Sequence, residues 1–271
     1  MKLAASNIAW LPEQDGQAAA LLKRAGFEGI EVALTREWPD LRNAPIADVR
    51  AFARRWSDEG LPIVSAQALL FGRPELLLLG PPAVRRQTID YLRHVFDLCA
   101  AADAAKMVFG SPRNRRREGR SQADAMAIAT EVFRKLGAEA ARRGLVLAIE
   151  ANPPQYGGDF ITTVREAVEL VEAVAHPGFR LHLDYGCMTM AGEPIDESVT
   201  LARPFVVHAH ASAPNLEPLT DSTAALPAFV TALNAVRYDG WLSLEMRRPE
   251  TNDLSALERS IQYVRDSAAA R

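Results

Sequence analysis

Short apolar segments that are typical of buried strands alternate with longer amphipathic segments along the whole chain of 271 residues. The apolar segments are too short for helices, whereas the amphipathic segments have helical length and periodicity. Strands are expected at residues 2–9, 29–34, 62–71, 106–112, 145–152, 179–185, 205–212 and 241–246. Helices are expected at residues 14–25, 46–59, 84–102, 121–143, 163–175, 197–202, 224–236 and 255–269. Such an order makes successive strands parallel, with a helical crossover between them.

Eight strand–helix repeats predict an α/β fold, a single (β/α)8 TIM barrel that takes up residues 1–271 as one domain. A barrel of this kind needs about 250 residues. A doubly wound open sheet is the alternative, but no GxGxxG motif follows the first strand and the sequence contains no P-loop. The sixth helix is the weakest element, because Pro194 and Pro204 flank it.

The segment LVLAIEAN, residues 145–152, carries a carboxylate in what should be a buried strand. Alternate residues of a strand share a face, so Glu150 and Asn152 point the same way as Val146 and Ala148. Burying a carboxylate is costly unless it is paired or binds a metal. Glu150 therefore needs a partner inside the barrel.

Three later strands carry a titratable residue at a matching position, namely Asp184, His210 and Glu245. The C-terminal strand ends form the active site of nearly every barrel enzyme. Three carboxylates gathered there would repel one another unless a cation lay among them. Mostly oxygen ligands with one imidazole suit Mn²⁺ or Mg²⁺, with Co²⁺ acceptable, better than a structural Zn²⁺. The alternative is that the acids form salt bridges inside the barrel, for example with Arg180 or Arg247.

The ordered set of Glu150 in LAIEAN, Asp184 in LHLDYG, His210 in VHAHAS and Glu245 in LSLEM resembles the xylose-isomerase-like barrels. This superfamily includes sugar phosphate isomerases and epimerases, hydroxypyruvate isomerases, dehydroshikimate dehydratases and endonuclease IV. The resemblance implies one divalent ion, commonly Mn²⁺, held by these four side chains. It also implies that the two glutamates act as catalytic base and acid, through an enediolate.

The chain departs from the ketose 3-epimerases at three positions that contact substrate in that group. Cys187 stands in place of a histidine, Tyr156 in place of a second glutamate, and Leu216 in place of an arginine. The metal positions are thus retained, whereas the pocket for a free ketohexose is not.

Further side chains are candidates for the barrel mouth. The residues predicted to bind substrate are Arg113, Asn152, Cys187 and Arg247. The rest of the arginine-rich run at residues 111–120 is expected to be a solvated loop or an oligomer contact. His182 and His208 should lie one layer deeper in a buried polar network that Arg180 and Ser243 complete. Asn7, Glu31 and Gln67 could line the opposite wall.

The leading functional interpretation is a metal-dependent isomerase or epimerase of a sugar, sugar phosphate or related keto acid. A dehydratase or lyase with the same metal is second, and a metabolite-binding barrel without turnover is third. A net charge of −3 without a long basic stretch argues against nucleic acid as a partner. The sequence has no apolar run long enough to span a bilayer and no signal peptide, and two cysteines give no disulfide framework, so a cytoplasmic protein is expected. A homo-oligomer, dimer or tetramer, is compatible with this interpretation.

Overall fold

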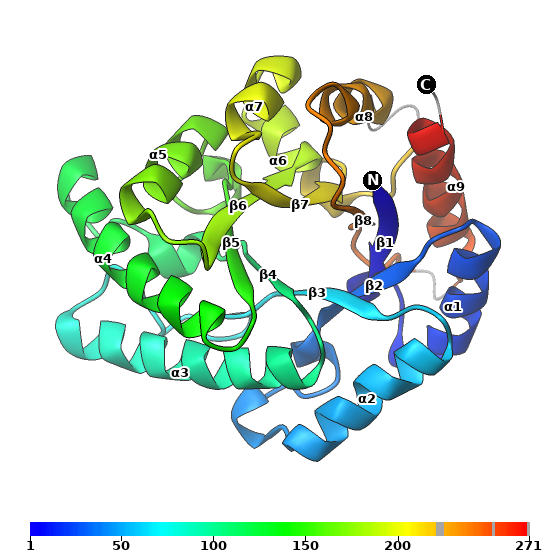
Figure 1. The fold of residues 1–271 in the computed structure, drawn as a ribbon, viewed down its shortest axis with the longest axis horizontal. Coiled ribbons are helices and arrows are strands. Elements are labelled where there is room, and N and C mark those ends of the chain that lie inside the picture. The colour runs from blue at the N-terminus through cyan, green and yellow to red at the C-terminus, as the bar shows by residue number, and fades with distance from the viewer. Residues whose placement is uncertain (221–224, 251–252, 270–271) are drawn as a thin grey trace.

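The strands of the structure, a computed structural model, form one closed parallel barrel in which neighbours follow sequence order and β8 pairs with β1 (Figure 1). The residues described are 1–220, 225–250 and 253–269. The strands are β1 Lys2–Ser6, β2 Gly29–Ala33, β3 Ile63–Gln67, β4 Lys106–Phe109, β5 Val146–Glu150, β6 Phe179–Asp184, β7 Val206–Ala211 and β8 Trp241–Leu244. The predicted TIM barrel is confirmed.

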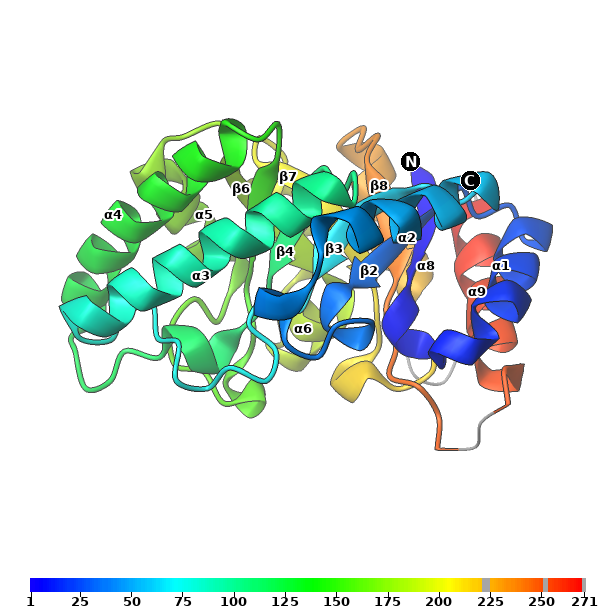
Figure 2. The ribbon, with the colours of Figure 1, turned by 90° about the horizontal axis from the view of Figure 1, so that it is seen from below.

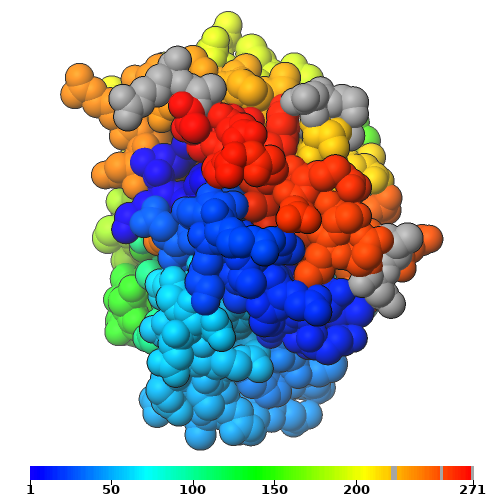
Figure 3. Space-filling model, turned by 90° about the vertical axis from the view of Figure 1, so that its right-hand side faces the viewer, coloured from blue at the N-terminus to red at the C-terminus, as the bar shows by residue number. Residues whose placement is uncertain are grey.

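Helices surround the barrel and cover its outer face (Figures 1 and 2). They are α1 Asp15–Arg24, α2 Ile46–Asp58, α3 Pro82–Ala101, α4 Gln122–Ala141, α5 Val164–Val174, α6 Tyr185–Met190, α7 Ile195–Ala202, α8 Leu226–Ala235 and α9 Ser255–Ala269. The last helix, α9, packs beside the first, α1, which closes the outer ring (Figure 3). Across the described residues, every helix is too short or too polar to traverse a bilayer.

Three expected strands end three or four residues early, and one of them is β4, which was expected to reach residue 112 and ends at Phe109. The strand expected from residue 2 ends at Ser6, and a 3-10 helix at Asn7–Ala9 follows it. The strand expected at residues 62–71 ends at Gln67, because Ala68 takes a left-handed backbone conformation with φ of 58°. Beyond these points Ala9, Leu69 and Leu70 are buried in loops, whereas Phe71 is 72% exposed.

The region after β6 holds one helix more than expected. The weak helix predicted at 197–202 is α7, which begins directly after Pro194, and α6 precedes it immediately after β6. The side chain of Asp184 accepts a hydrogen bond from the backbone N–H of Cys187 and so caps α6. Residue 224, where the next helix was expected to begin, lies outside the described residues, and α8 begins at Leu226.

The apolar core lies between the barrel and its helices, while the centre of the barrel is polar. Outside the strands, Phe133 of α4 stacks on Phe179 of β6, with ring centroids 4.7 Å apart. Inside the barrel, Glu31, Ser65 and His208 are fully buried. TIM barrels usually fill this space with branched apolar side chains. A polar interior is costly unless its members satisfy one another, so it marks the place where a site is built.

Candidate metal centre

The four predicted metal ligands all lie at the C-terminal end of the barrel. Glu150 and Asp184 are the last residues of β5 and β6, His210 is next to last in β7, and Glu245 directly follows β8. Asp184 is paired with His210 across the β6–β7 ladder. The backbone N–H of Glu245 donates to the carbonyl of Ala211 in β7, at 2.9 Å. The four residues are at most 8% exposed.

The distances around His210 are those expected of ligands that share one ion. Its Nδ1 atom lies 3.0 Å from Oε2 of Glu245 and 3.4 Å from Oδ2 of Asp184. With metal–ligand bonds of about 2.1 Å, two donor atoms are about 3.0 Å apart at a right angle and about 3.4 Å apart at the tetrahedral angle. Both distances to Nδ1 are therefore compatible with a shared divalent cation, and donor atoms of all three residues lie within 4.8 Å of one another.

Glu150 joins this group through Asp184. Donor atoms of Glu150, Asp184 and Cys187 form a second group within 4.8 Å of one another, and Asp184 belongs to both groups. Oε1 of Glu150 accepts a hydrogen bond from Nδ2 of Asn152 at 2.7 Å and lies 3.3 Å from the sulfur of Cys187. The structure thus brings all four predicted ligands into one continuous cluster, and it places Cys187 within that cluster.

Asp184 is held by backbone and side-chain donors on both oxygens. Its Oδ1 accepts the N–H of Cys187 at 2.6 Å, and its Oδ2 accepts the hydroxyl of Ser212 at 2.7 Å. Ser212 in turn accepts the N–H of Gly186 at 2.9 Å. A side chain at Gly186 would place its Cβ 2.7 Å from the Ser212 hydroxyl, so only glycine allows this close approach.

His210 is oriented by the buried carboxylate of Glu31, which was expected elsewhere in the barrel. Its Nε2 lies 2.8 Å from Oε1 of Glu31, whose other oxygen lies 2.7 Å from Nε2 of His208 and accepts the Ser65 hydroxyl at 2.6 Å. A proton on Nε2 of His210 leaves Nδ1 free to face Asp184 and Glu245. Glu31, expected on the opposite wall, instead supports the candidate ligand from beneath. Burial alone would raise the pKa of Glu31, but the two histidines hold it well below its usual range.

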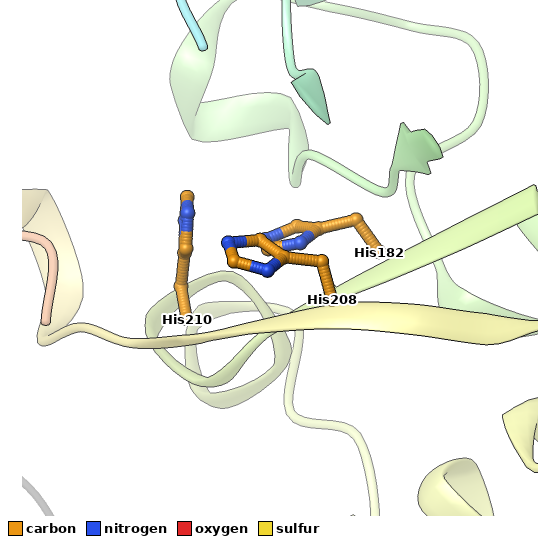
Figure 4. Close-up of side chains that lie close together, drawn as sticks. All are labelled: His182, His208 and His210. Atoms are coloured by element: carbon orange, nitrogen blue, oxygen red, sulfur yellow. The ribbon is translucent and has the colours of Figure 1, made fainter. Parts of the chain in front are cut away.

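His182, His208 and His210 lie together in the centre of the barrel (Figure 4). The ring centroids of His182 and His210 are 4.1 Å apart, and neither ring nitrogen of His182 makes a well-aligned hydrogen bond. Burial, together with the neighbouring imidazoles, lowers the pKa of His182 well below its usual value, so the ring is neutral. The predicted buried network is confirmed only for His208, which contacts Glu31 and Ser65. Arg180 is not in it, because its guanidinium donates to the carbonyls of His176 and Phe179. The hydroxyl of Ser243 is buried without a hydrogen-bond partner among the described residues.

The cluster carries excess negative charge. Burial raises the pKa of Glu150 to about 8, and the carboxylates of Asp184 and Glu245 add to this effect. Although burial opposes it, the carboxylates around His210 raise the pKa of that imidazole well above its usual value. The two arginines considered as partners lie elsewhere: Arg180 binds carbonyls, and Arg247 is an exposed residue paired with Glu217. A divalent cation would supply the missing charge.

The predicted substrate-binding residues are placed in three different ways. Asn152 and Cys187 contact Glu150 directly. Arg113 is exposed on the loop after β4 and runs along Gly157 of the loop after β5. Arg247 pairs with Glu217 on the surface.

Two residues near Glu150 were not anticipated. Arg115 is fully buried, and its guanidinium donates to the carbonyl of Glu150 and to Oδ1 of Asn152, both at 2.8 Å. Gly110 faces the carboxylate itself, since a Cβ at this position would lie 1.9 Å from Oε2 of Glu150. Nothing in the run at 111–120 distinguishes Arg115 from its neighbours, but the glycine directly after β4 is a visible signal of close approach.

Comparison with solved structures shows the same fold at low sequence identity. A 3-keto-D-glucoside 4-epimerase from E. coli superposes with a TM-score of 0.79 at 19% identity, covering 98% of this chain and 99% of that chain. A D-psicose 3-epimerase from Clostridium cellulolyticum H10, solved with D-tagatose, gives a TM-score of 0.82 at 15% identity, covering 99% and 98%. The IolI protein with a bound zinc atom gives 0.73 at 19% identity, covering 99% and 97%.

Sequence comparison identifies the family. No curated protein sequence matches the chain. Residues 19–267 match the profile of the xylose isomerase-like TIM barrel family, which covers all strands from β2 to β8. The chain therefore belongs to the xylose isomerase-like TIM barrel family.

Proposed function

We propose that this chain, as one barrel domain over residues 1–271, is a divalent-metal-dependent isomerase or epimerase. Its substrate would be a sugar, a sugar phosphate or a related keto acid. The observation that carries the proposal is the spacing of Asp184 and Glu245 around Nδ1 of His210, at 3.4 and 3.0 Å. That spacing suits one ion, and the ion would lie where barrel enzymes bind substrate.

Glu150, Asp184, His210 and Glu245 would hold the ion. When bound, it would stabilise negative charge on a substrate oxygen next to the reacting carbon. Mn²⁺ is the ion that the family resemblance favours, with Mg²⁺ or Co²⁺ as alternatives. The oxygen-rich donor set is consistent with each of these ions.

Glu150 and Glu245 would move the proton of the substrate carbon. They come from β5 and β8, with Asp184 and His210 on the strands between them, so they approach the centre of the site from different directions. One carboxylate would remove the proton from one side of the carbon, and the other would return it. The amide of Asn152 fixes the orientation of the Glu150 carboxylate, at 2.7 Å.

The structural relatives guide the choice of substrates. One relative is named for a 3-keto-D-glucoside, and another was solved with D-tagatose. Carbohydrates are therefore the first substrates to test.

Both cysteines, Cys99 and Cys187, are free and buried, which supports a reducing compartment such as the cytoplasm.

The test is exchange of carbon-bound hydrogen in deuterated water. Wild-type protein with Mn²⁺ would be incubated with 3-keto sugars, free ketohexoses, ketose phosphates and 2-keto acids, and products analysed by mass spectrometry and NMR. One class should gain deuterium at the reacting carbon. Glu150→Gln and Glu245→Gln should each lower turnover by about 10²- to 10⁴-fold. Glu131→Gln, on the exposed face of α4, is the matched control and should be unaffected.

Two outcomes would change the proposal. A product that has one water molecule less than the substrate would indicate the dehydratase or lyase reaction on the same scaffold. Normal turnover by a variant that carries both Glu150→Gln and Glu245→Gln would refute the proposed roles of the two glutamates.

A further inference from the structure

Cys187 lies inside the cluster of candidate ligands. It is 5% exposed and stands in the first turn of α6, three residues after Asp184. Its sulfur is 3.3 Å from Oε1 of Glu150, and donor atoms of Cys187, Glu150 and Asp184 all lie within 4.8 Å of one another. Cys99, the other cysteine, is buried in α3 within the apolar core. Only Cys187 therefore combines a thiol with neighbouring metal-ligand carboxylates.

The thiol of Cys187 donates a hydrogen bond to Oε1 of Glu150, and the separation of Sγ and Oε1 also matches that of two ligands on a common ion. A metal–sulfur bond of about 2.3 Å and a metal–oxygen bond of about 2.1 Å place the two atoms about 3.1 Å apart at a right angle and about 3.6 Å apart at the tetrahedral angle. The observed 3.3 Å lies between these values. A single ion could thus contact Glu150 and Cys187 without movement of either backbone.

The amide of Asn152 contacts both candidate ligand atoms. Its Nδ2 donates to Oε1 of Glu150 at 2.7 Å and also lies 3.5 Å from the sulfur of Cys187. Oδ1 of the same amide accepts from Arg115 at 2.8 Å, which fixes the NH₂ group toward the two candidate ligands. Hydrogen-bond donors that orient ligand atoms are a usual feature of metal sites.

We propose that Cys187 is a further ligand of the ion and gives the site a preference for Co²⁺ and Zn²⁺ over Mn²⁺ and Mg²⁺. This inference rests on the proposed function, since it concerns the same site. A thiolate is a softer ligand than a carboxylate, so it favours the later divalent ions. On binding, the thiol proton is released to solvent and the sulfur forms a bond to the ion, with no change of oxidation state. The favoured ion then differs from the Mn²⁺ that the resemblance implies.

Cobalt provides the direct test, because a thiolate bound to Co²⁺ gives a near-ultraviolet charge-transfer band. Metal-free full-length protein would be titrated with Co²⁺ alone, and absorption would be recorded together with bound cobalt per chain. Wild type should show the band at saturation. Cys187→Ser and Cys187→Ala should bind cobalt without the band, while Cys99→Ala should retain it.

A second measurement needs no variant at Cys187. The ¹¹³Cd resonance of the wild-type Cd²⁺ complex should lie downfield of the range for oxygen and nitrogen ligands, because thiolate sulfur deshields the nucleus. In competition titrations, Cys187→Ser should also lower the ratio of Zn²⁺ to Mn²⁺ affinity. This ratio should fall at least about tenfold, because the loss of a residue that only orients a metal ligand already costs about that much affinity.

The outcomes separate this inference from the function on which it rests. Cobalt binding by wild type without the charge-transfer band, or persistence of the band in Cys187→Ala, would overturn the role of Cys187 and leave the metal site intact. Failure of wild type to bind Co²⁺, Zn²⁺ and Mn²⁺ would overturn both proposals. Binding of two ions per chain, one for each group that shares Asp184, would overturn the single shared ion.

Discussion

Nε2 of His210 lies 2.8 Å from Oε1 of Glu31, a carboxylate without any exposed surface. The second oxygen of Glu31 lies 2.7 Å from Nε2 of His208. One carboxylate thus accepts from two imidazoles, and the histidine proposed to bind metal is oriented by the nitrogen opposite its ligand atom. Glu31→Gln should therefore weaken metal binding by about 10- to 100-fold, the usual cost of losing such a partner.

The physical reason lies in the amide that replaces the carboxylate. Glutamine has one acceptor oxygen, so one of the two imidazole N–H groups would face an NH₂ group instead. Titration calorimetry of metal-free protein with Mn²⁺ measures the affinity, and circular dichroism shows whether the variant is folded. Glu28→Gln, exposed and three positions earlier, is the control. A folded Glu31→Gln variant with wild-type affinity would contradict this role.

Gly110→Ala should impair the site more than the fold. The new Cβ would lie 1.9 Å from Oε2 of Glu150, so the carboxylate must move. Overpacking of this kind costs about 1–3 kcal/mol of stability. Turnover should fall by about 10²-fold or more, since Glu150 is the proposed base or acid. Gly16→Ala in α1, where the added Cβ meets nothing within 4 Å, is the control and should leave turnover unchanged. Unchanged turnover in Gly110→Ala would show that the position of Glu150 is unimportant.

Removal of the metal should lower the melting temperature. An ion at about 100 times its Kd stabilises the folded chain by about 2.7 kcal/mol, which corresponds to about 5–10 °C for a protein of this size. Chelation monitored by differential scanning calorimetry should produce that shift in wild type. Asp184→Ala should melt at the same temperature with and without chelator, whereas Asp97→Ala, an exposed partner of Arg143, should retain the shift. A wild-type protein that loses all metal without any change in melting temperature would speak against the site.

Arg115→Met should destabilise the chain strongly, because it keeps much of the bulk and removes the donors. The guanidinium binds the carbonyls of Glu150, Phe160 and Ile161 and the side chain of Asn152. Hydrogen bonds to charged groups contribute about 1.5–3 kcal/mol each, and the stranded acceptors would remain buried. The expected loss is about 3 kcal/mol or more by urea denaturation. Arg116→Met, the exposed neighbour, should stay within about 0.5 kcal/mol of wild type. Equal stability of the two variants would show that the buried hydrogen bonds of Arg115 do not contribute to the free energy of unfolding.

The barrel could be predicted because its signal is repeated eight times. The apolar runs of β5, β6 and β8 ended within two residues of the strand ends, so Glu150, Asp184 and Glu245 could be assigned to the mouth of the expected barrel. The structure brings these side chains together with His210, while their roles as ligands remain predictions. Spacing along a strand is local, and it survives errors of one or two residues at strand ends.

Features that depend on register or loop path could not be predicted. The whole of β2 is buried, so its sequence does not say which residue Glu31 will meet, and only barrel closure brings it beneath His210 on β7. Helix α6 has six residues, too few for periodicity to reveal it, although Asp184 is a recognisable cap. Arg115 differs from Arg116 only in where the loop after β4 turns inward.

Arg113→Ala addresses the charge of the substrate. Arg113 is exposed at the barrel mouth beside Gly157, whereas Arg247 is already paired with Glu217. Arg113 is therefore the better placed of the two to meet a phosphate or carboxylate on the substrate. For an anionic substrate, Arg113→Ala should raise KM by about fivefold with little change in kcat, since an exposed ion pair contributes up to about 1 kcal/mol.

The control is Arg116→Ala, which removes an exposed arginine from the same loop. Raising the ionic strength to about 1 M shortens the Debye length to about 3 Å, so salt should raise the wild-type KM toward that of Arg113→Ala. Arg113→Ala itself should respond less to salt, because the screened interaction is already gone. Steady-state kinetics at two salt concentrations measures all four values. Rapid turnover of a neutral ketohexose, with a KM that neither salt nor Arg113→Ala changes, would show that the substrate carries no charge for Arg113 to recognise.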